Sequence, residues 1–274
     1  MMLRRLLTIY GVAFFVFIYA PILLVVIYSF NANTINMMIW SGFTLDWYRQ
    51  IFGLETAITD STSYVDSSAQ LYAALRTSLI VAVSTSVFST VCGTALALAV
   101  ARYRFRLAGF YRALMLVPMI MPDIVLGIAL LIFFVTLSMN LSVMTIIIGQ
   151  STFLISYVFV TVSARLAAFD TSLEEASADL GATPAQTFRK VTLPGIAPGI
   201  LGGWLLAFII SMDDLVITYF IAGTGNTTLP IHIWGMLRRG IKPEINAIAT
   251  LMLLFTVVVA GIGLYLRSRT QDKP

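Results

Sequence analysis

The sequence predicts an all-α integral membrane protein with about six transmembrane helices. The chain has 274 residues, of which 59% are hydrophobic and 11% are charged, and its mean hydropathy is +0.92. This composition lies far outside the range of soluble globular proteins. Apolar runs of about 20 residues recur along the chain, and this is the length that a helix needs to cross the hydrocarbon core.

Six such runs are present, at 8–30, 77–100, 113–137, 143–164, 199–222 and 246–266. The first run follows Arg4 and Arg5, as a signal peptide would, but its apolar core is too long and no small-residue cleavage pattern follows it. We therefore expect it to remain as an anchor. Pro118 and Pro122 remove backbone donors from the third run and predict a kink there.

The distribution of basic residues predicts the orientation of these spans. With the N-terminus inside, the 17 Lys and Arg residues divide into 12 on the inner side and 5 on the outer side. The inner residues are Arg4, Arg5, Arg102, Arg104, Arg106, Arg112, Arg165, Arg189, Lys190, Arg267, Arg269 and Lys273. Because cytoplasmic loops carry an excess of Lys and Arg, both termini are predicted to lie in the cytoplasm. Anionic lipid headgroups then account for the net charge of +4 without a nucleic-acid partner.

We expect residues 1–274 to form one transmembrane domain with two notable loops. The outer loop, 31–76, contains Leu45, Tyr48, Ile51 and Phe52 on one helical face, which predicts an interfacial helix. This helix either packs on the spans or contacts a soluble partner. The inner loop, 166–198, is the longest polar stretch between two predicted spans on that side.

The inner loop is predicted to form a helix, a turn and a second helix. Thr171 or Ser172 is a candidate cap for a first helix that carries acidic residues near its start. Gly181 is expected to end this helix. Thr183 followed by Pro184 predicts the start of a second helix, which Pro194 is expected to stop.

Carboxylates inside the predicted spans are the candidate substrate ligands. Asp123 in the third span and Asp213 and Asp214 in the fifth fall at about one depth, where no Lys or Arg lies. A cationic substrate would compensate their charge. Adjacent residues lie about 100° apart around a helix, so one of Asp213 and Asp214 is expected to face the pathway. Tyr219 is the aromatic candidate, although such residues serve more often in packing.

Other chemistries find little support in the sequence. Cys92 is the one cysteine and His232 the one histidine, so no Cys/His metal cluster is predicted. The glycines of 223–230, GTGNTTLP, are not followed by the Gly-Lys-Ser/Thr of a phosphate-binding loop. We expect no cofactor in this chain, and no nucleophile and base arrangement of an enzyme is visible.

The inner loop resembles the cytoplasmic loop of ABC importer permeases, which reads EAA, three residues, Gly, and a downstream Phe and Leu-Pro. Glu175, Ala176, Gly181, Phe188 and Leu193-Pro194 match that spacing, while Ser177 replaces the second alanine. The resemblance implies the type I permease fold, with this loop as the element that couples the chain to separate ATPase subunits. The coupling residues it implies are Glu174, Glu175, Ala176, Asp179, Leu180, Gly181, Ala182 and Phe188.

The likeness extends over essentially the whole chain to one group of these permeases. The segments YAPILLVVIYSFN, VPMIMPDIVLG, SLEEASADLGATP, LLAFIISMDDLVITYFIAG and TTLPIHIW resemble the second permease of spermidine/putrescine ABC transporters. This implies a second, homologous permease, two ATPase subunits that bind ATP and Mg, and a periplasmic binding protein as partners.

Two alternatives remain open at this point. The same machine could carry another substrate, such as ferric ion, thiamine or an opine, because intramembrane acids favour cations without specifying amines. A proton-coupled secondary transporter would instead use Asp123, Asp213 and Asp214 as proton sites. Such a transporter would not need the helical hairpin of the inner loop.

Overall fold

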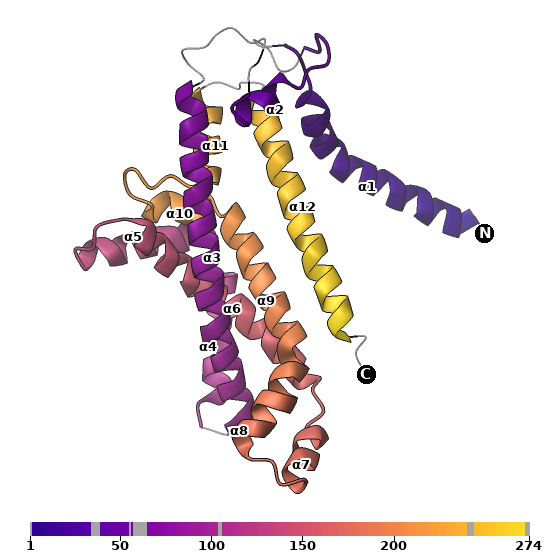
Figure 1. The fold of residues 1–274 in the computed structure, drawn as a ribbon, viewed down its shortest axis with the longest axis vertical. Helices are drawn as coiled ribbons and strands as arrows, with labels where there is room; N and C mark the ends of the chain where they lie inside the picture. The colour runs from indigo at the N-terminus through magenta and orange to yellow at the C-terminus, as the bar shows by residue number, and fades with distance from the viewer. Residues whose placement is uncertain are drawn as a thin grey trace. The chain divides into compact units, whose positions relative to one another are not determined.

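In the computed structural model, the described part of the chain is helical. It comprises residues 2–33, 39–54, 56, 65–103, 106–239 and 244–271, and the rest of the predicted outer loop lies outside it. By their contacts the residues form two compact units, one of 1–72 with 232–257 and the other of 73–231 with 258–274. Figure 1 shows the course of the chain.

Five helices are long and apolar enough to cross a membrane, and a bent pair of helices makes a sixth candidate among the described residues. This agrees with the six spans that the sequence predicts. The first half of the chain contains α1 (Met2–Tyr28), α2 (Asp46–Ile51), α3 (Val65–Arg102), α4 (Ala108–Ile120), α5 (Asp123–Thr136) and α6 (Val143–Ala167). The second half contains α7 (Ser172–Asp179), α8 (Pro184–Thr187), the π-helical turn η1 (Phe188–Thr192), α9 (Leu193–Asp213), α10 (Val216–Ile221), α11 (Leu229–Arg239) and α12 (Glu244–Gln271).

The bent pair is the predicted third span, which breaks into α4 and α5 at an angle of 104°. Met121 and Pro122 have extended backbone at the break. Pro122 has no N–H and disfavours helical backbone at the residue before it, so the chain turns here. The predicted kink is therefore confirmed, and it amounts to a full break.

The larger unit is built on the contact between α6 and α9. Val158 of α6 lies between two glycines: an added Cβ would come 2.8 Å from the Val158 side chain at Gly93 of α3 and 3.2 Å from it at Gly203 of α9. Gly199 approaches Arg165 of α6 in the same way. In lipid, helices associate through such close van der Waals contact. Gly199 and Gly203, four residues apart, thus let α9 pack closely against α6.

The predicted fifth span also breaks, which the sequence did not reveal. We expected one run over 199–222, but α9 ends at Asp213, Asp214 has extended backbone, and α10 follows as a separate short helix. α10 packs against α5, the short half of the other broken span (Figure 1). The two breaks therefore lie in neighbouring parts of the larger unit.

The smaller unit contains the short helix α2. Trp47 of α2 is 1% exposed, and its ring nitrogen donates a hydrogen bond of 2.8 Å to the carbonyl of Asn31. Ile51 is buried, whereas Leu45 and Phe52 of the predicted apolar face are exposed. Trp47 thus anchors the helix through a contact that periodicity alone does not indicate.

Candidate functional site

The first helix of the inner-loop hairpin, α7, is capped by a residue that the sequence analysis did not select. The carboxylate of Asp170 accepts a 3.0 Å hydrogen bond from the backbone N–H of Ser172, whereas Thr171 and Ser172 make no side-chain cap contact. Hydrogen bonds from Ser172 lower the pKa of Asp170 below its usual value. The expected cap was wrong because an Asp one residue earlier reaches the free N–H groups.

The turn after α7 requires glycine. The N–H of Gly181 bonds the carbonyl of Ala178, and the N–H of Ala182 bonds that of Ser177, which is the Schellman pattern. Gly181 has φ +81°, in the left-handed region, and nothing lies within 4 Å of the position where a Cβ would be. Gly181 ends the helix as predicted, for reasons of backbone conformation.

The second helix begins as predicted and continues beyond its expected end. The hydroxyl of Thr183 and the side chain of Gln186 form a capping box, with Pro184 at the first position. Pro194 does not stop this helix, however, because the π turn η1 intervenes and the chain runs on into α9. With Pro194 placed in the first turn of α9, its missing N–H is tolerated.

Ser177, the departure from the family pattern, joins the two arms of the hairpin. Its hydroxyl lies 3.0 Å from that of Thr187 on α8. Alanine at this position could not make this hydrogen bond. The serine therefore adds a contact between α7 and α8 that alanine would lack.

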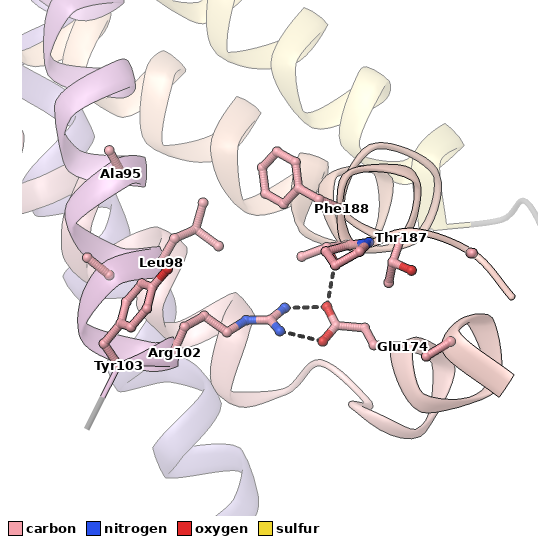
Figure 2. Close-up of a pocket in the computed structure, with 12 residues that line it drawn as sticks. Ala95, Leu98, Arg102, Tyr103, Glu174, Thr187 and Phe188 are labelled. Carbon is pink, nitrogen blue, oxygen red and sulfur yellow. Dashed lines mark hydrogen bonds and ion pairs between the residues drawn. The ribbon is translucent and has the colours of Figure 1, made fainter.

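The predicted coupling residues divide into two groups in the structure. Six of them are exposed: Glu175, Ala176, Asp179, Leu180, Gly181 and Phe188. Leu180 is 89% exposed, which is unusual for a leucine outside a binding surface or a lipid contact. Glu174 and Ala182 are less exposed, and together with Phe188 and residues from the end of α3 they line a cavity of about 630 Å³ (Figure 2).

Glu174 is held within the chain. Both guanidinium nitrogens at the end of the Arg102 side chain donate to its carboxylate, and the hydroxyl of Thr192 donates to the same group. The hydrogen bonds from Arg102 lower the pKa of Glu174, so the carboxylate is charged at neutral pH. From the sequence alone, Arg102 is one of the basic residues of the inner side, and no partner was predicted for it.

The three predicted acids come together around a second cavity, of about 280 Å³. Asp123 begins α5, and Asp213 and Asp214 lie at the break after α9. None of the lining residues is Lys or Arg. Asp123 and Asp213 are exposed, and no hydrogen bond to either carboxylate occurs within the described part of the chain.

Asp214 differs from Asp213 in its surroundings. Its carboxylate accepts hydrogen bonds from the backbone N–H groups of Ile217 and Thr218, from the Thr218 hydroxyl and from the amide of Gln150. Asp214 thus satisfies the free N–H groups at the start of α10. Asp214 therefore binds its neighbours, and which aspartate faces the pathway stays a prediction.

Gln150 of α6 is not among the substrate-binding residues predicted from the sequence, which are three aspartates and one tyrosine. It is 1% exposed and contacts both sides of the break. It accepts from Ser211 of α9 and donates to Asp214 and to Thr218 of α10. A glutamine in the middle of an apolar run was the available signal, because buried polar groups need partners.

Aromatic residues take different places from those predicted. Tyr219 on α10 is 51% exposed and does not line the acidic cavity. Phe153 and Tyr157 of α6 do line it, and their rings pack edge to face with centroids 6.3 Å apart. Residues one turn apart on α6 thus supply the aromatic wall.

Similar proteins identify the family. The profile of the family described as "Binding-protein-dependent transport system inner membrane component" matches residues 89–272, a range that contains both the hairpin and the acidic cavity. The chain belongs to this family. It is thus a permease subunit of an ABC importer and a multi-pass protein of the inner membrane.

Two named relatives match nearly the whole chain. The putrescine transport system permease protein PotI of Escherichia coli K12 is 38% identical over 94% of this chain and 89% of its own length. The spermidine/putrescine transport system permease protein PotC of the same strain is 35% identical over 94% of this chain and 93% of its own length. Both relatives are permeases of the group that the sequence motifs resemble.

Solved structures support the fold. A chain of a bacterial ABC transporter that imports the acidic polysaccharide alginate has a TM-score of 0.68 with this chain, at 15% identity, and 98% and 95% of the two chains are covered. A chain of the inward-facing MetNI methionine ABC transporter has a TM-score of 0.58 at 18% identity, with 73% and 94% covered. The predicted ABC importer permease fold is confirmed.

Proposed function

We propose that this permease forms half of the translocation pathway of an ATP-driven importer for polyamines such as putrescine and spermidine. Three carboxylates border one cavity that no Lys or Arg lines, and this observation carries the proposal. Carboxylates without a basic partner are costly within a membrane protein, and a cationic substrate offsets that cost. The names of the 38% and 35% identical relatives point to the same substrate class.

Asp123 and Asp213 are the proposed substrate ligands. Their carboxylates are exposed, whereas that of Asp214 is taken up by the start of α10. Tyr157 borders the same cavity, and its ring face can attract an ammonium group. In this arrangement the carboxylates of Asp123 and Asp213 replace part of the hydration shell of an amine. The carboxylate of Asp214 caps the start of α10 instead.

The proposed assembly contains a second homologous permease, two ATPase subunits and a periplasmic binding protein that delivers the polyamine. ATP and Mg are bound by the ATPase subunits, and both termini of this chain lie in the cytoplasm with the hairpin. The exposed side of the hairpin, with Glu175 and Leu180, contacts the ATPase. Anionic lipids contact the basic inner residues.

The proposed cycle uses closure of the ATPase subunits to move the hairpin. Its displacement passes to the membrane helices, and the pathway switches from inward-facing to outward-facing. The polyamine then enters the cavity from the binding protein. Reopening of the ATPase subunits after hydrolysis returns the pathway to the cytoplasmic side.

The deciding experiment measures ATP hydrolysis by the complete complex in proteoliposomes. The binding protein is loaded in turn with putrescine, spermidine, ferric ion or thiamine. We expect stimulation by a polyamine only. Stimulation by another ligand would keep the assignment as an ABC importer and contradict the polyamine as its substrate. Uptake driven by a proton gradient without ATP would favour the secondary transporter.

A further inference from the structure

Glu174 and Glu175 are adjacent on α7 but have different surroundings. The Glu174 side chain is 13% exposed and is bound by Arg102 and Thr192, whereas Glu175 is exposed. Residues next to each other on a helix point about 100° apart, so one can face a partner while the other faces the chain itself. The two carboxylates therefore have separate tasks.

The Glu174 carboxylate connects three elements. Glu174 lies on α7. Its carboxylate accepts hydrogen bonds from the two terminal guanidinium nitrogens of Arg102, the last residue of α3, and from the hydroxyl of Thr192 in η1. Figure 2 shows the Arg102 and Glu174 side chains pointing toward each other from α3 and α7. A bidentate arginine–carboxylate pair fixes direction as well as distance.

Other contact between α7 and α3 is limited. The cavity of about 630 Å³ lies beside the ion pair, with Leu98 and Tyr103 of the α3 end on one side and Ala178 of α7 on the other. An open cavity leaves few close van der Waals contacts to carry force between two helices. The ion pair between Arg102 and Glu174 is consequently the main contact between α3 and α7 among the described residues.

We propose that the Arg102–Glu174–Thr192 cluster is a strut that passes displacement of α7 to α3 and, through η1, to α9. The proposal rests on the coupling role of the hairpin proposed above, and makes Arg102, Glu174 and Thr192 positioning residues. α3 is a long membrane helix, and α9 ends at the acidic cavity, so the strut joins the ATPase contact to both. Coupling then travels through a contiguous set of named contacts.

The test measures the number of substrate molecules transported per ATP hydrolysed, in the complete complex in proteoliposomes with binding protein and putrescine. The variants are Arg102→Glu, Glu174→Arg and the double exchange. We expect each single variant to lower this ratio about fivefold to tenfold, the lower part of the range for coupling between sites. The double exchange restores most of the ratio, because it restores the ion pair.

Arg106→Glu is the matched control. Arg106 lies between α3 and α4, four residues after Arg102, and is exposed. The same charge change there removes as much positive charge without touching Glu174. We expect its ratio to equal that of the unmodified protein. The milder variants Arg102→Gln and Glu174→Gln cover the case in which a charge reversal prevents assembly, and they should lower the ratio in the same direction.

Three outcomes would overturn the strut: unchanged coupling in the Arg102 and Glu174 variants, an equal loss in Arg106→Glu, or a double exchange as defective as the worse single variant. Gly181→Trp, measured alongside, separates this failure from that of the hairpin. If Gly181→Trp lowers the ratio and Arg102→Glu does not, the strut is wrong and the hairpin stands. If neither does, both proposals are wrong.

Discussion

The side-chain amide of Gln150 on α6 donates a 3.1 Å hydrogen bond to the carboxylate of Asp214, at the break between α9 and α10. The same amide donates to Thr218 on α10, and its oxygen accepts from Ser211 on α9. One buried side chain thus holds both ends of a broken helix. This arrangement leaves Asp213, the neighbour of Asp214, at the cavity.

Replacing Gln150 should destabilise the protein and impair transport. Gln150→Met keeps the length of the side chain but removes its donors and acceptor, so Ser211 and Asp214 lose buried partners. We expect a loss of about 1–3 kcal/mol in stability, the usual result of an unpaired buried polar group. Thermal unfolding of the purified complex in lipid measures it.

Thr152→Val is the control for Gln150→Met. Thr152 lies on the same helix, is exposed, and uses its hydroxyl only for a bond of 3.0 Å to the carbonyl of Ile148 among the described contacts. Little change is expected there. Equal stability of the Gln150 and Thr152 variants would contradict the bridging role of Gln150.

Asp213→Asn should weaken polyamine binding during transport. The substitution removes a negative charge that borders the cavity but keeps the size of the side chain. We expect KM for putrescine uptake to rise about tenfold, which corresponds to about 1.4 kcal/mol, close to the lower end of the range for hydrogen bonds to charged groups. Asp46→Asn, on α2 and outside that cavity, is the matched control, and an equal KM in both variants would count against Asp213 as a ligand.

Asp214→Asn should act differently from Asp213→Asn. Its carboxylate caps α10, and asparagine keeps an acceptor oxygen but loses the charge. We expect reduced uptake with reduced thermal stability, while the ATPase subunits remain assembled. Unchanged uptake kinetics would contradict any role of Asp214 in the pathway.

Gly181→Trp should uncouple ATP hydrolysis from transport without removing the protein from the membrane. Gly181 has φ +81°, which a bulky side chain adopts only with strain, and it lies beside the exposed Leu180. Gly181→Asn is the matched variant, because asparagine tolerates left-handed backbone. We expect putrescine uptake near zero in the first and near normal in the second; normal uptake by Gly181→Trp would reject the coupling assignment.

The Glu174 carboxylate should keep its charge below the pH at which glutamates ordinarily titrate. Its pKa is lowered by the hydrogen bonds from Arg102, so the stabilisation from this contact is present above the unfolded-state pKa of about 4.3 and is lost as pH falls through the lower folded-state pKa. Infrared difference spectra of the protein and of Glu174→Gln isolate this carboxyl. In Arg102→Gln the titration should move to higher pH, and an unmoved titration would exclude Arg102 as the cause.

The sequence by itself determined the class of the protein, the spans and the hairpin. Apolar run length, basic residues and the EAA-type spacing are local properties, and a membrane helix satisfies its own backbone groups, so each span follows from its own residues. Gly181 as the end of α7 and Thr183 as the start of α8 follow from the same kind of local chemistry.

Only the tertiary structure decided which charged and polar groups meet. At the break of the fifth span Asp214 contacts Gln150, 64 residues before it, and Glu174 contacts Arg102, 72 residues before it. No local pattern records such pairings, because side chains from distant segments come together only after the helices have packed. The π turn that carries the chain past Pro194 belongs to the same group, since it depends on how η1 and α9 lie against their neighbours.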